Sequence, residues 1–276
     1  MVFGIPPPLC AAAAEIFMPS RLGQNFLRSR SLRRQIVSLL SPSLNEVIIE
    51  IGAGHGELTS ELLNLYPANP IIAVEKDRHL AALLIRLFKS SPNLKIIHAD
   101  ILHLVKDGFI LPENTSGYSL IGNLPYYLTG RLLRLLGGNN RFPTEIILTV
   151  QKEVAARLAP PPAKFNLLAA SVSWWGTVQK CLSLSPKEFS PSPQVASAVI
   201  KITPRPREAL INKDAFYKII KVAFAHPRKT LANNLASGLK LSKSAALNLI
   251  KLIGLKADSR PSDLTYSKIH SLVSRL

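Results

Sequence analysis

Cysteine is scarce in this chain of 276 residues, since Cys10 and Cys181 are the only two. Two cysteines so far apart exclude a disulfide framework and a cysteine-based metal cluster, and the sequence contains no zinc-type spacing. We therefore expect a reducing compartment, which here means a cytoplasmic location, and no bound metal.

Acidic residues are scarce as well, with 17 Asp and Glu against 34 Lys and Arg, so the formal charge is +17. Few globular proteins carry such an imbalance without an anionic partner, either a nucleic acid or a membrane surface. The excess is greatest near the C-terminus. Residues 205–276 contain 14 Lys and Arg against 4 Asp and Glu, a net charge of +10, which leaves +7 for residues 1–204.

Basic residues are missing from the apolar opening segment, where the first arginine is Arg21. The segment therefore lacks the charged start of a signal peptide and the arginines of a transit peptide. It is also too short, and too often interrupted by proline, to span a membrane, so we expect no membrane partner. We interpret residues 1–17 as a disordered leader or an over-extended start, with Met18 as the expected first residue.

Short apolar runs and amphipathic stretches alternate along the next part of the chain. Strands are expected at residues 46–51, 71–75, 94–98, 119–122 and 145–150, and helices at residues 32–40, 58–66, 80–89 and 131–136. This alternation predicts a parallel sheet with helices on both faces. Two later runs, Leu167 to Trp175 continuing toward Leu182 and Val195 to Ile202, predict a closing antiparallel pair of strands.

The composition changes at Pro204-Arg205-Pro206. Beyond this point helical periodicity recurs in four segments separated by glycine or proline, at residues 215–224, 229–237, 242–253 and 266–273. We therefore expect an α/β domain at residues 18–204 and a small, basic, all-α domain at residues 205–276.

Polar residues follow the ends of successive strands. The first strand leads into Gly52-Ala53-Gly54-His55-Gly56, a loop that lets the backbone approach a ligand, although its spacing is not the phosphate-binding fingerprint. Glu75, about 20 residues on, is placed to accept two ribose hydroxyls, and Asp100 to accept an adenine amino group. Asn123 ends the fourth strand. Together they predict a nucleotide-like ligand at the carboxyl edge of the sheet. Singly, Glu75 and Asp100 could merely start the helices that follow.

The tetrapeptide Asn123-Leu124-Pro125-Tyr126 is suited to hold an exocyclic amine. The Asn amide oxygen can accept a hydrogen bond from an amino group, and the proline keeps the turn rigid so that a backbone carbonyl can accept another. The tyrosine adds a flat face for a base. The alternative is an ordinary strand-to-helix turn, in which Asn and Pro are common.

Six motifs occur in a fixed order between about Arg21 and the C-terminus. They are Gly23-Gln24-Asn25-Phe26-Leu27, residues 50–59 (EIGAGHGELT), Gly122-Asn123-Leu124-Pro125-Tyr126-Tyr127, residues 151–158 (QKEVAARL), residues 189–199 (FSPSPQVASAV) and residues 228–235 (RKTLANNL). In these motifs the sequence resembles the 16S ribosomal RNA adenine dimethyltransferases (KsgA/RsmA type). The likeness covers both the expected α/β domain and the helical tail.

The resemblance implies a Rossmann-like class I methyltransferase sheet, S-adenosylmethionine as methyl donor, no metal, and two neighbouring adenosines in a terminal hairpin loop of 16S rRNA as acceptors, each dimethylated at N6. It also implies roles for single residues: Asn25 and Leu27 would pack against the donor, Gly52 would line its methionine and ribose side, Glu75 would hold the ribose, Asp100 the adenine amine, and Asn123 would stand between donor and target. Asn123 and the Leu124 carbonyl would aim the amine, Pro125 would stiffen the turn, and Tyr126 would stack on the base.

The basic tail would bind RNA phosphates through Arg228, Lys229, Lys240 and Lys243, with little reading of sequence. The alternative is a merely solvated helix face. The chain departs from the family at His226-Pro227-Arg228, where two adjacent arginines are more typical. Pro227 removes one charge and one backbone donor, which puts one phosphate contact in doubt.

Other residues receive structural interpretations. We expect the six histidines to be loop or surface residues, and Trp174 and Trp175 to pack within a strand pattern. Phe26 could stack on the target base or belong to the core.

Two alternative functions share these features. One is the related resistance-type methyltransferase acting on 23S rRNA, against which Leu124 and the Arg228-Lys229-Thr230-Leu231 tail argue. The other is an assembly factor that binds immature small ribosomal subunits with catalysis secondary or lost. Our expectation is a 16S rRNA methyltransferase that acts on the immature small subunit during its biogenesis, as a monomer.

Overall fold

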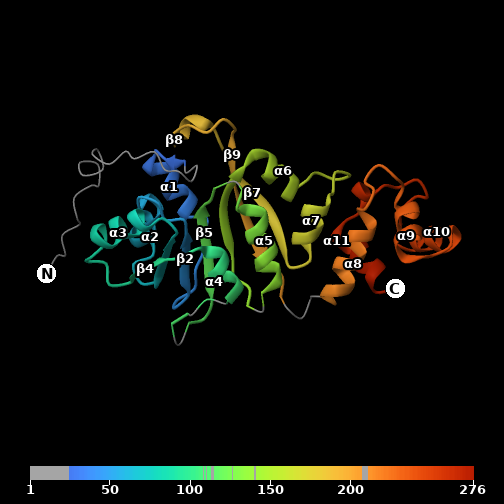
Figure 1. Ribbon diagram of the computed structural model, residues 1–276, viewed down its shortest axis with the longest axis horizontal. Coiled ribbons are helices and arrows are strands. Elements are labelled where there is room, and N and C mark those ends of the chain that lie inside the picture. Colours follow the sequence, from blue (N-terminus) through green and yellow to red (C-terminus); the bar gives the residue numbers. More distant parts are fainter. Residues whose placement is uncertain are drawn as a thin grey trace.

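A computed structural model describes residues 25–276 of the protein, except residues 108, 110, 113, 114, 126, 140 and 207–210. The expectations for residues 1–17, for Met18 and for Tyr126 lie outside the described residues. The molecule is elongated, with a helix-flanked sheet at one end of its long axis and a group of helices at the other (Figure 1).

Seven described strands form one sheet in the order β4-β3-β2-β5-β6-β9-β7, and a separate short ladder pairs β1 with β8. Neighbours among β2 to β6 run parallel, whereas β9 is antiparallel to both β6 and β7. The strands are β1 (Phe26–Leu27), β2 (Val47–Ile51), β3 (Ile71–Glu75), β4 (Leu94–His98), β5 (Tyr118–Asn123), β6 (Ile146–Gln151), β7 (Gly176–Leu184), β8 (Phe189–Ser190) and β9 (Ser197–Pro204). The parallel sheet with a closing antiparallel pair is confirmed.

The expectation that the closing strand begins near Leu167 is wrong. Residues Leu167–Ser173 form helix α7, and β7 starts only at Gly176. The Asn166 side chain caps this helix by accepting hydrogen bonds from the backbone N–H groups of Leu168 and Ala169. A short apolar run does not distinguish a strand from a helix by its periodicity, so the cap decides.

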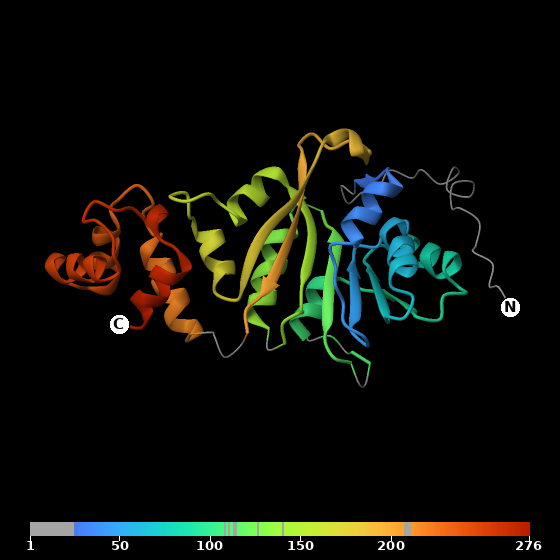
Figure 2. The same cartoon turned by 180° about the vertical axis from the view of Figure 1, so that it is seen from behind.

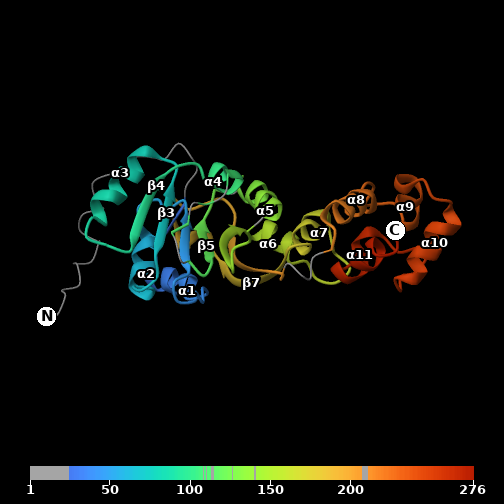
Figure 3. The ribbon, with the colours of Figure 1, turned by 90° about the horizontal axis from the view of Figure 1, so that it is seen from below.

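Helices cover both faces of the sheet: α1 and α2 lie on one side, and α4 and α5 on the other (Figure 3). Two hydrophobic cores result, one joining α1 and α2 to the sheet and one joining α4, α5 and α7 to its opposite face. The helices of this part are α1 (Arg30–Val37), α2 (Glu57–Leu65), α3 (Arg78–Leu87), α4 (Ile101–Asp107), α5 (Thr129–Gly138), α6 (Lys152–Leu158) and α7 (Leu167–Ser173).

The elements after Pro204 are helical. They are α8 (Lys213–Ala223), α9 (Leu231–Leu239), α10 (Lys243–Leu252), a 3-10 turn (Pro261–Asp263) and α11 (Tyr266–Val273). Their core is continuous with that of α7 through the buried Trp174 and Trp175. The indole N–H of Trp174 donates to the Ile211 carbonyl at 3.0 Å. The packing interpretation of both tryptophans is confirmed, although they follow a helix and not a strand.

The hairpin between β7 and β9 carries a 3-10 turn (Pro186–Glu188) and β8, and rises above the carboxyl edge of the sheet beside α1 (Figure 2). There β8 pairs antiparallel with β1, so that Phe26 lies opposite Ser190 and Leu27 opposite Phe189. This ladder places the residues around Phe26 over the sheet edge where β2 and β5 end. None of the helices in the described part of the chain is long and apolar enough to cross a membrane.

Candidate active site

The loop between β2 and α2 has a backbone that requires glycine. Gly52, Gly54 and Gly56 have φ angles of 69°, 60° and 90°, values that side chains with a Cβ rarely adopt. A Cβ on Gly52 would meet nothing within 4 Å, so the backbone there faces open space. The loop therefore presents bare backbone to whatever lies above the carboxyl edge of the sheet.

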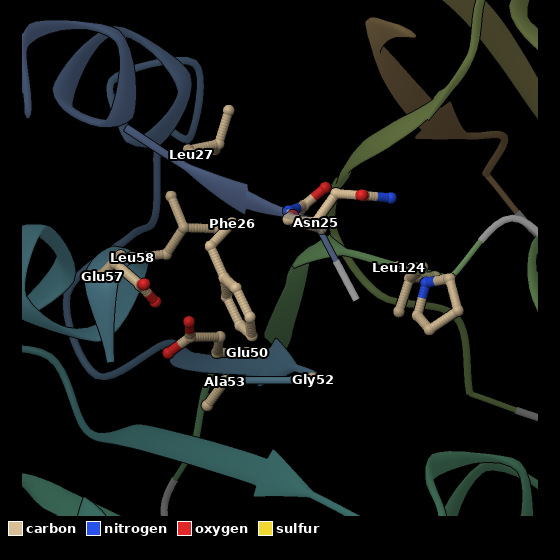
Figure 4. A pocket seen from close by; sticks show the side chains of 11 residues that line it. Asn25, Phe26, Leu27, Glu50, Gly52, Ala53, Glu57, Leu58 and Leu124 are labelled. Atoms are coloured by element: carbon tan, nitrogen blue, oxygen red, sulfur yellow. The ribbon is translucent and has the colours of Figure 1, made fainter. Parts of the chain in front are cut away.

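A pocket opens above this loop, between it and strand β1 (Figure 4). Its lining comes from three segments far apart in the sequence: Asn25, Phe26 and Leu27; Glu50, Gly52, Ala53, Glu57 and Leu58; and Asn123, Leu124 and Pro125. The structure thus brings together the predicted residues Asn25, Leu27, Gly52 and the first three residues of the tetrapeptide.

Asn123, at the end of β5, is held by the backbone of Asn25. Its Nδ2 donates to the Asn25 carbonyl oxygen at 2.6 Å. A carbonyl oxygen only accepts, so this bond fixes which end of the amide faces β1 and leaves Oδ1 as the acceptor end. The side chain is partly exposed at the pocket wall. An amine that approaches Asn123 would therefore meet a positioned acceptor.

Phe26 extends from β1 toward Glu50 and Ala53, with its ring in the pocket (Figure 4). The ring packs against the bare Cα of Gly54, because a Cβ there would lie 2.7 Å from Phe26 Cε1. It also meets the His55 ring edge to face, with centroids 4.3 Å apart. The sequence left open whether Phe26 belongs to the core or stacks on a base. The ring lies in the pocket and outside the three hydrophobic clusters, so it is not a core residue.

Glu75 ends β3 and supports the glycine loop from below. One carboxylate oxygen accepts from the Gly54 N–H and the other from the Asp77 N–H, each at 2.8 Å. The residue is 1% exposed and does not line the pocket itself. Each oxygen keeps a second lone pair, so Glu75 can still accept a hydrogen bond from a hydroxyl group of a ligand that reaches the Gly54 side.

Asp100 caps helix α4. Its Oδ1 accepts from the Leu102 N–H at 2.9 Å, and its Oδ2 pairs with Lys76 Nζ at 3.0 Å. Burial raises the pKa of Asp100, but these two hydrogen bonds outweigh it and hold the pKa below its ordinary value. The structure confirms the capping interpretation, and Asp100 lies outside the pocket lining.

Two carboxyl groups that the sequence did not single out also line the pocket. Glu50 sits at the end of the apolar strand β2, where burial raises the pKa to about 8 and the nearby Glu57 and Glu75 add to the shift. Burial likewise raises the pKa of Glu57. Both lie in the motif of residues 50–59, which gave neither of them a role, and Glu50 is also an acidic residue inside the apolar run VIIEI.

The pocket fits a ligand with positive charge. Bare glycine backbone on the floor, the ring of Phe26, and the carboxyl groups of Glu50 and Glu57 on one side suit a sulfonium and an ammonium group better than an anion. A positive charge beside the two carboxyl groups would lower their raised pKa values and so favour their ionised forms. S-adenosylmethionine carries both groups. The residues present therefore match the donor that the sequence implied.

The predicted RNA-binding residues of the tail are all exposed. Arg228 and Lys229 precede the N-terminus of α9, whereas Lys240 and Lys243 follow its C-terminus, so the helix separates them into two pairs. The histidines are not buried, as expected: His79, His98, His103 and His226 are exposed, and His55 and His270 are half-buried. Within the described residues, no three His, Cys, Asp or Glu side chains form a group that could hold a metal.

Two comparisons with solved structures support the fold. The protein superposes with TM-scores of 0.75 on a 23S rRNA methyltransferase, ErmE, and on a dimethyladenosine transferase from Plasmodium falciparum, at 20% sequence identity in each case. Each match covers 91% of this chain, and 99% and 96% of the respective structures. Identity this low supports the shared methyltransferase fold alone.

Sequence comparisons are more specific. The chain is 35% identical to ribosomal RNA small subunit methyltransferase A of Koribacter versatilis, over 93% of this chain and 94% of that protein. It is 36% identical to the protein of the same name from Chlorobium luteolum, over 87% of this chain and 89% of that protein. Residues 18–276 match the family model described as ribosomal RNA adenine dimethylase. The resemblance seen in the six motifs is confirmed, and the chain belongs to the ribosomal RNA adenine dimethylase family.

Proposed function

We propose that the protein transfers methyl groups from S-adenosylmethionine to N6 of two adjacent adenosines in the 3′-terminal hairpin loop of 16S rRNA, two to each adenosine. The observation that carries the proposal is the amide of Asn123, fixed by Asn25 at the wall of the glycine-loop pocket. The relatives named small subunit methyltransferase A support the choice of rRNA.

On the donor side, Gly52 and the backbone around Leu27 would receive the methionine end. Its positive charge would favour the ionised forms of Glu50 and Glu57, whose raised pKa values otherwise favour the protonated carboxyl. Glu75 would accept hydrogen bonds from the ribose hydroxyls, and Asp100 would accept one from the adenine amine. Each would use carboxylate lone pairs that do not already accept from the protein backbone. When bound, the donor supplies a methyl group activated by an adjacent sulfonium. The pocket residues contribute position and charge.

On the acceptor side, Asn123 Oδ1 and the Leu124 carbonyl would accept the two N–H bonds of the target amine. Two such bonds orient the nitrogen so that its lone pair faces the pocket, and orientation is most of what an in-line displacement needs. Pro125 keeps the turn rigid, and Tyr126 would stack on the base. After transfer the donor would leave as the neutral thioether, and the methylated nitrogen would lose one N–H proton to water, because an amide oxygen accepts a hydrogen bond but is too weak a base to take the proton.

The rest of the proposal concerns the RNA and its setting. Arg228, Lys229, Lys240 and Lys243 would contact phosphates from two ends of α9. The substrate would be the immature small subunit, so that methylation accompanies subunit biogenesis in the cytoplasm. The protein would act as a monomer.

The test is incubation with S-adenosylmethionine labelled in the methyl group and with small and large ribosomal subunits from cells that lack this methylation. We expect label in the two adjacent adenosines near the 3′ end of 16S rRNA, found as dimethyladenosine after digestion. Label only in 23S rRNA would overturn the substrate in favour of the resistance-type reaction. Binding to small subunits without any transfer would point to the assembly factor instead.

A further inference from the structure

The outward face of α5 carries cations that neither the pocket nor the tail uses. Arg131 and Arg134 are exposed, whereas Leu132, Leu133 and Leu136 of the same helix are buried against the sheet. Residues three and four apart share one helix face, so Arg131, Arg134 and Gly138 lie in one row. Helix α5 begins just after the Asn123-Leu124-Pro125 turn.

The gap in this row at Gly138 is filled from another part of the chain. The Nζ of Lys213, the first residue of α8, lies 3.9 Å from the point where a Cβ of Gly138 would be. Lys213 thus supplies the third cation of the row. We call Arg131, Arg134 and Lys213 the α5 stripe. Figure 1 shows the arrangement, with α5 at the centre of the molecule and α8 beside α7 toward the helical end.

The α5 stripe is not neutralised by acidic residues of the described chain. The ion pairs found there join other residues, and none includes a member of the stripe. Glu145, the described acidic residue nearest to Arg134 in the sequence, pairs with Lys201. Asp214, next to Lys213, is exposed and takes part in none of these ion pairs. The positive charge of Arg131 also reaches Lys76. The hydrogen bond with Asp100 raises the pKa of Lys76, and the charge of Arg131 opposes that rise.

Helix stability does not account for these cations. Arg131 lies in the first turn of α5 and Lys213 begins α8, and the positive end of a helix dipole disfavours a cation by about 0.3–1 kcal/mol. The Nζ of Lys213 lies 5.8 Å from the ring centroid of Trp174, a cation–π contact that holds the ammonium beside α5 without neutralising its charge. The row is therefore explained better by a ligand than by the fold.

We propose that the α5 stripe binds the sugar-phosphate backbone of the substrate RNA, as a second contact surface separate from the basic tail. This inference rests on the proposed function. With the helical rise of about 1.5 Å per residue, successive members of the row are roughly 4.5 and 6 Å apart along the axis, a spacing suited to consecutive phosphates of one strand. Because the row starts beside Asn123-Leu124-Pro125, it would fix the position of the strand that leads into the acceptor site.

The test compares two triple variants that remove equal charge. Arg131→Gln/Arg134→Gln/Lys213→Gln removes the stripe. Arg86→Gln/Lys89→Gln/Lys95→Gln removes three exposed cations, one on α3, one just after it and one on β4. Binding of a fluorescent RNA with the 3′-terminal hairpin of 16S rRNA is measured between low and moderate salt. We expect the stripe variant to lose about tenfold in affinity and its log–log salt slope to fall by about 2, with the control near wild type.

Three outcomes would overturn the inference. Equal losses of RNA affinity in both variants would mean that only net charge matters. Wild-type RNA affinity in the stripe variant would show that the α5 stripe does not bind the RNA. Loss of binding to phosphatidylserine vesicles without loss of RNA binding would assign the stripe to a membrane. Donor binding by calorimetry serves as the folding control. Methyl transfer by the wild type to undermethylated subunits is measured separately. Its absence would refute the proposed function but would leave the RNA-binding result of the stripe variant unchanged.

Discussion

Asn123, the last residue of β5, and Asn25, directly before β1, are joined by a hydrogen bond of 2.6 Å from the Asn123 amide to the Asn25 carbonyl. Strand β1 is in turn paired with β8 of the β7–β9 hairpin. The orientation of the proposed acceptor amide thus depends on a short ladder that joins the segment before α1 to the β7–β9 hairpin. One substitution at Asn123 can remove the acceptor oxygen, and another can keep an oxygen there but disturb its orientation.

Replacement of Asn123 should abolish methyl transfer. Asn123→Ala removes the acceptor, and Asn123→Asp places an oxygen against the Asn25 carbonyl, which repels it from its position. Each variant should lower the rate of transfer by about a hundredfold or more, because misplacement of a reacting group by about 1 Å already has that effect. Donor binding by calorimetry should remain measurable. Asn233→Ala, on the exposed side of α9, is the control, and unchanged turnover in Asn123→Ala would remove this residue from the mechanism.

A side chain at Gly54 should prevent donor binding. Gly54→Ala has to adopt a φ of 60° and places a methyl group 2.7 Å from Phe26 Cε1, so the ring and the loop are both displaced. The double variant Gly54→Ala/Phe26→Ala keeps the backbone strain but removes the contact, and should recover part of the affinity measured by calorimetry. Gly130→Ala, with nothing within 4 Å, should bind the donor like wild type. Full donor affinity in Gly54→Ala would contradict the close approach.

Local patterns predicted most of the sheet. Strands β3 and β4 and helix α11 begin and end where the sequence pattern placed them. Strand β3 is a continuous buried run, β4 is a short, mostly apolar run, and α11 has a clear helical face. The run that forms helix α7 predicts a strand because five of its seven residues are apolar and the run is too short to show a helical period, while the only helix signal is its cap, Asn166. Strands β1 and β8 have two residues each, and no periodicity reveals them.

The site was predictable to the extent that its residues end strands. Gly52 and Asn123 follow that rule, and the pocket contains both. The bond between Asn25 and Asn123 spans 98 positions and is invisible in the sequence. Glu50 and Glu57 were missed because an acidic side chain gives no local sign that it is buried, and burial is what raises the pKa of each.

Neutralisation of the tail should weaken RNA binding without affecting the donor. Lys229→Gln/Lys243→Gln removes one exposed cation from each end of α9, so both proposed phosphate contacts are tested at once. The log–log salt slope of hairpin RNA binding should fall by about 1.5, since each lost phosphate contact lowers it by about 0.7–0.9. Arg86→Gln/Lys89→Gln is the matched control. A slope equal to that of the control would show that α9 faces away from the RNA.

Glu75→Gln should weaken both the glycine loop and the donor affinity. The carboxylate accepts from two backbone N–H groups in a site with 1% exposure, and an amide offers only one oxygen. One buried N–H then faces an NH2 group, so the free energy of unfolding should fall by about 1–3 kcal/mol. Urea denaturation measures this loss, and calorimetry the donor affinity. Glu153→Gln, an exposed exchange on α6, should change neither, and a Glu75→Gln variant as stable as wild type would refute the double-acceptor role.

Glu50 should make the free energy of unfolding fall as the pH rises. Burial raises its pKa in the folded protein to about 8 from the ordinary value of 4.5, with Glu57 and Glu75 adding to the shift and the Thr59 hydroxyl, at 2.6 Å, opposing it. The folded state therefore binds the proton more tightly than the unfolded state. The stabilisation that comes from this proton is complete below about pH 4.5 and is lost as the pH rises toward 8.

Glu50→Gln replaces the protonated carboxyl with a neutral group of the same shape that can still accept from Thr59. The free energy of unfolding of the wild type should therefore fall relative to the variant between about pH 5 and pH 8.5, by an amount on the order of a few kcal/mol, and the two should be closest at the acidic end. Urea denaturation at several pH values measures this difference, with Glu153→Gln as the exposed control. A constant difference across the range would show that Glu50 titrates near its ordinary pKa, and hence that the pocket floor is wetter than its burial implies.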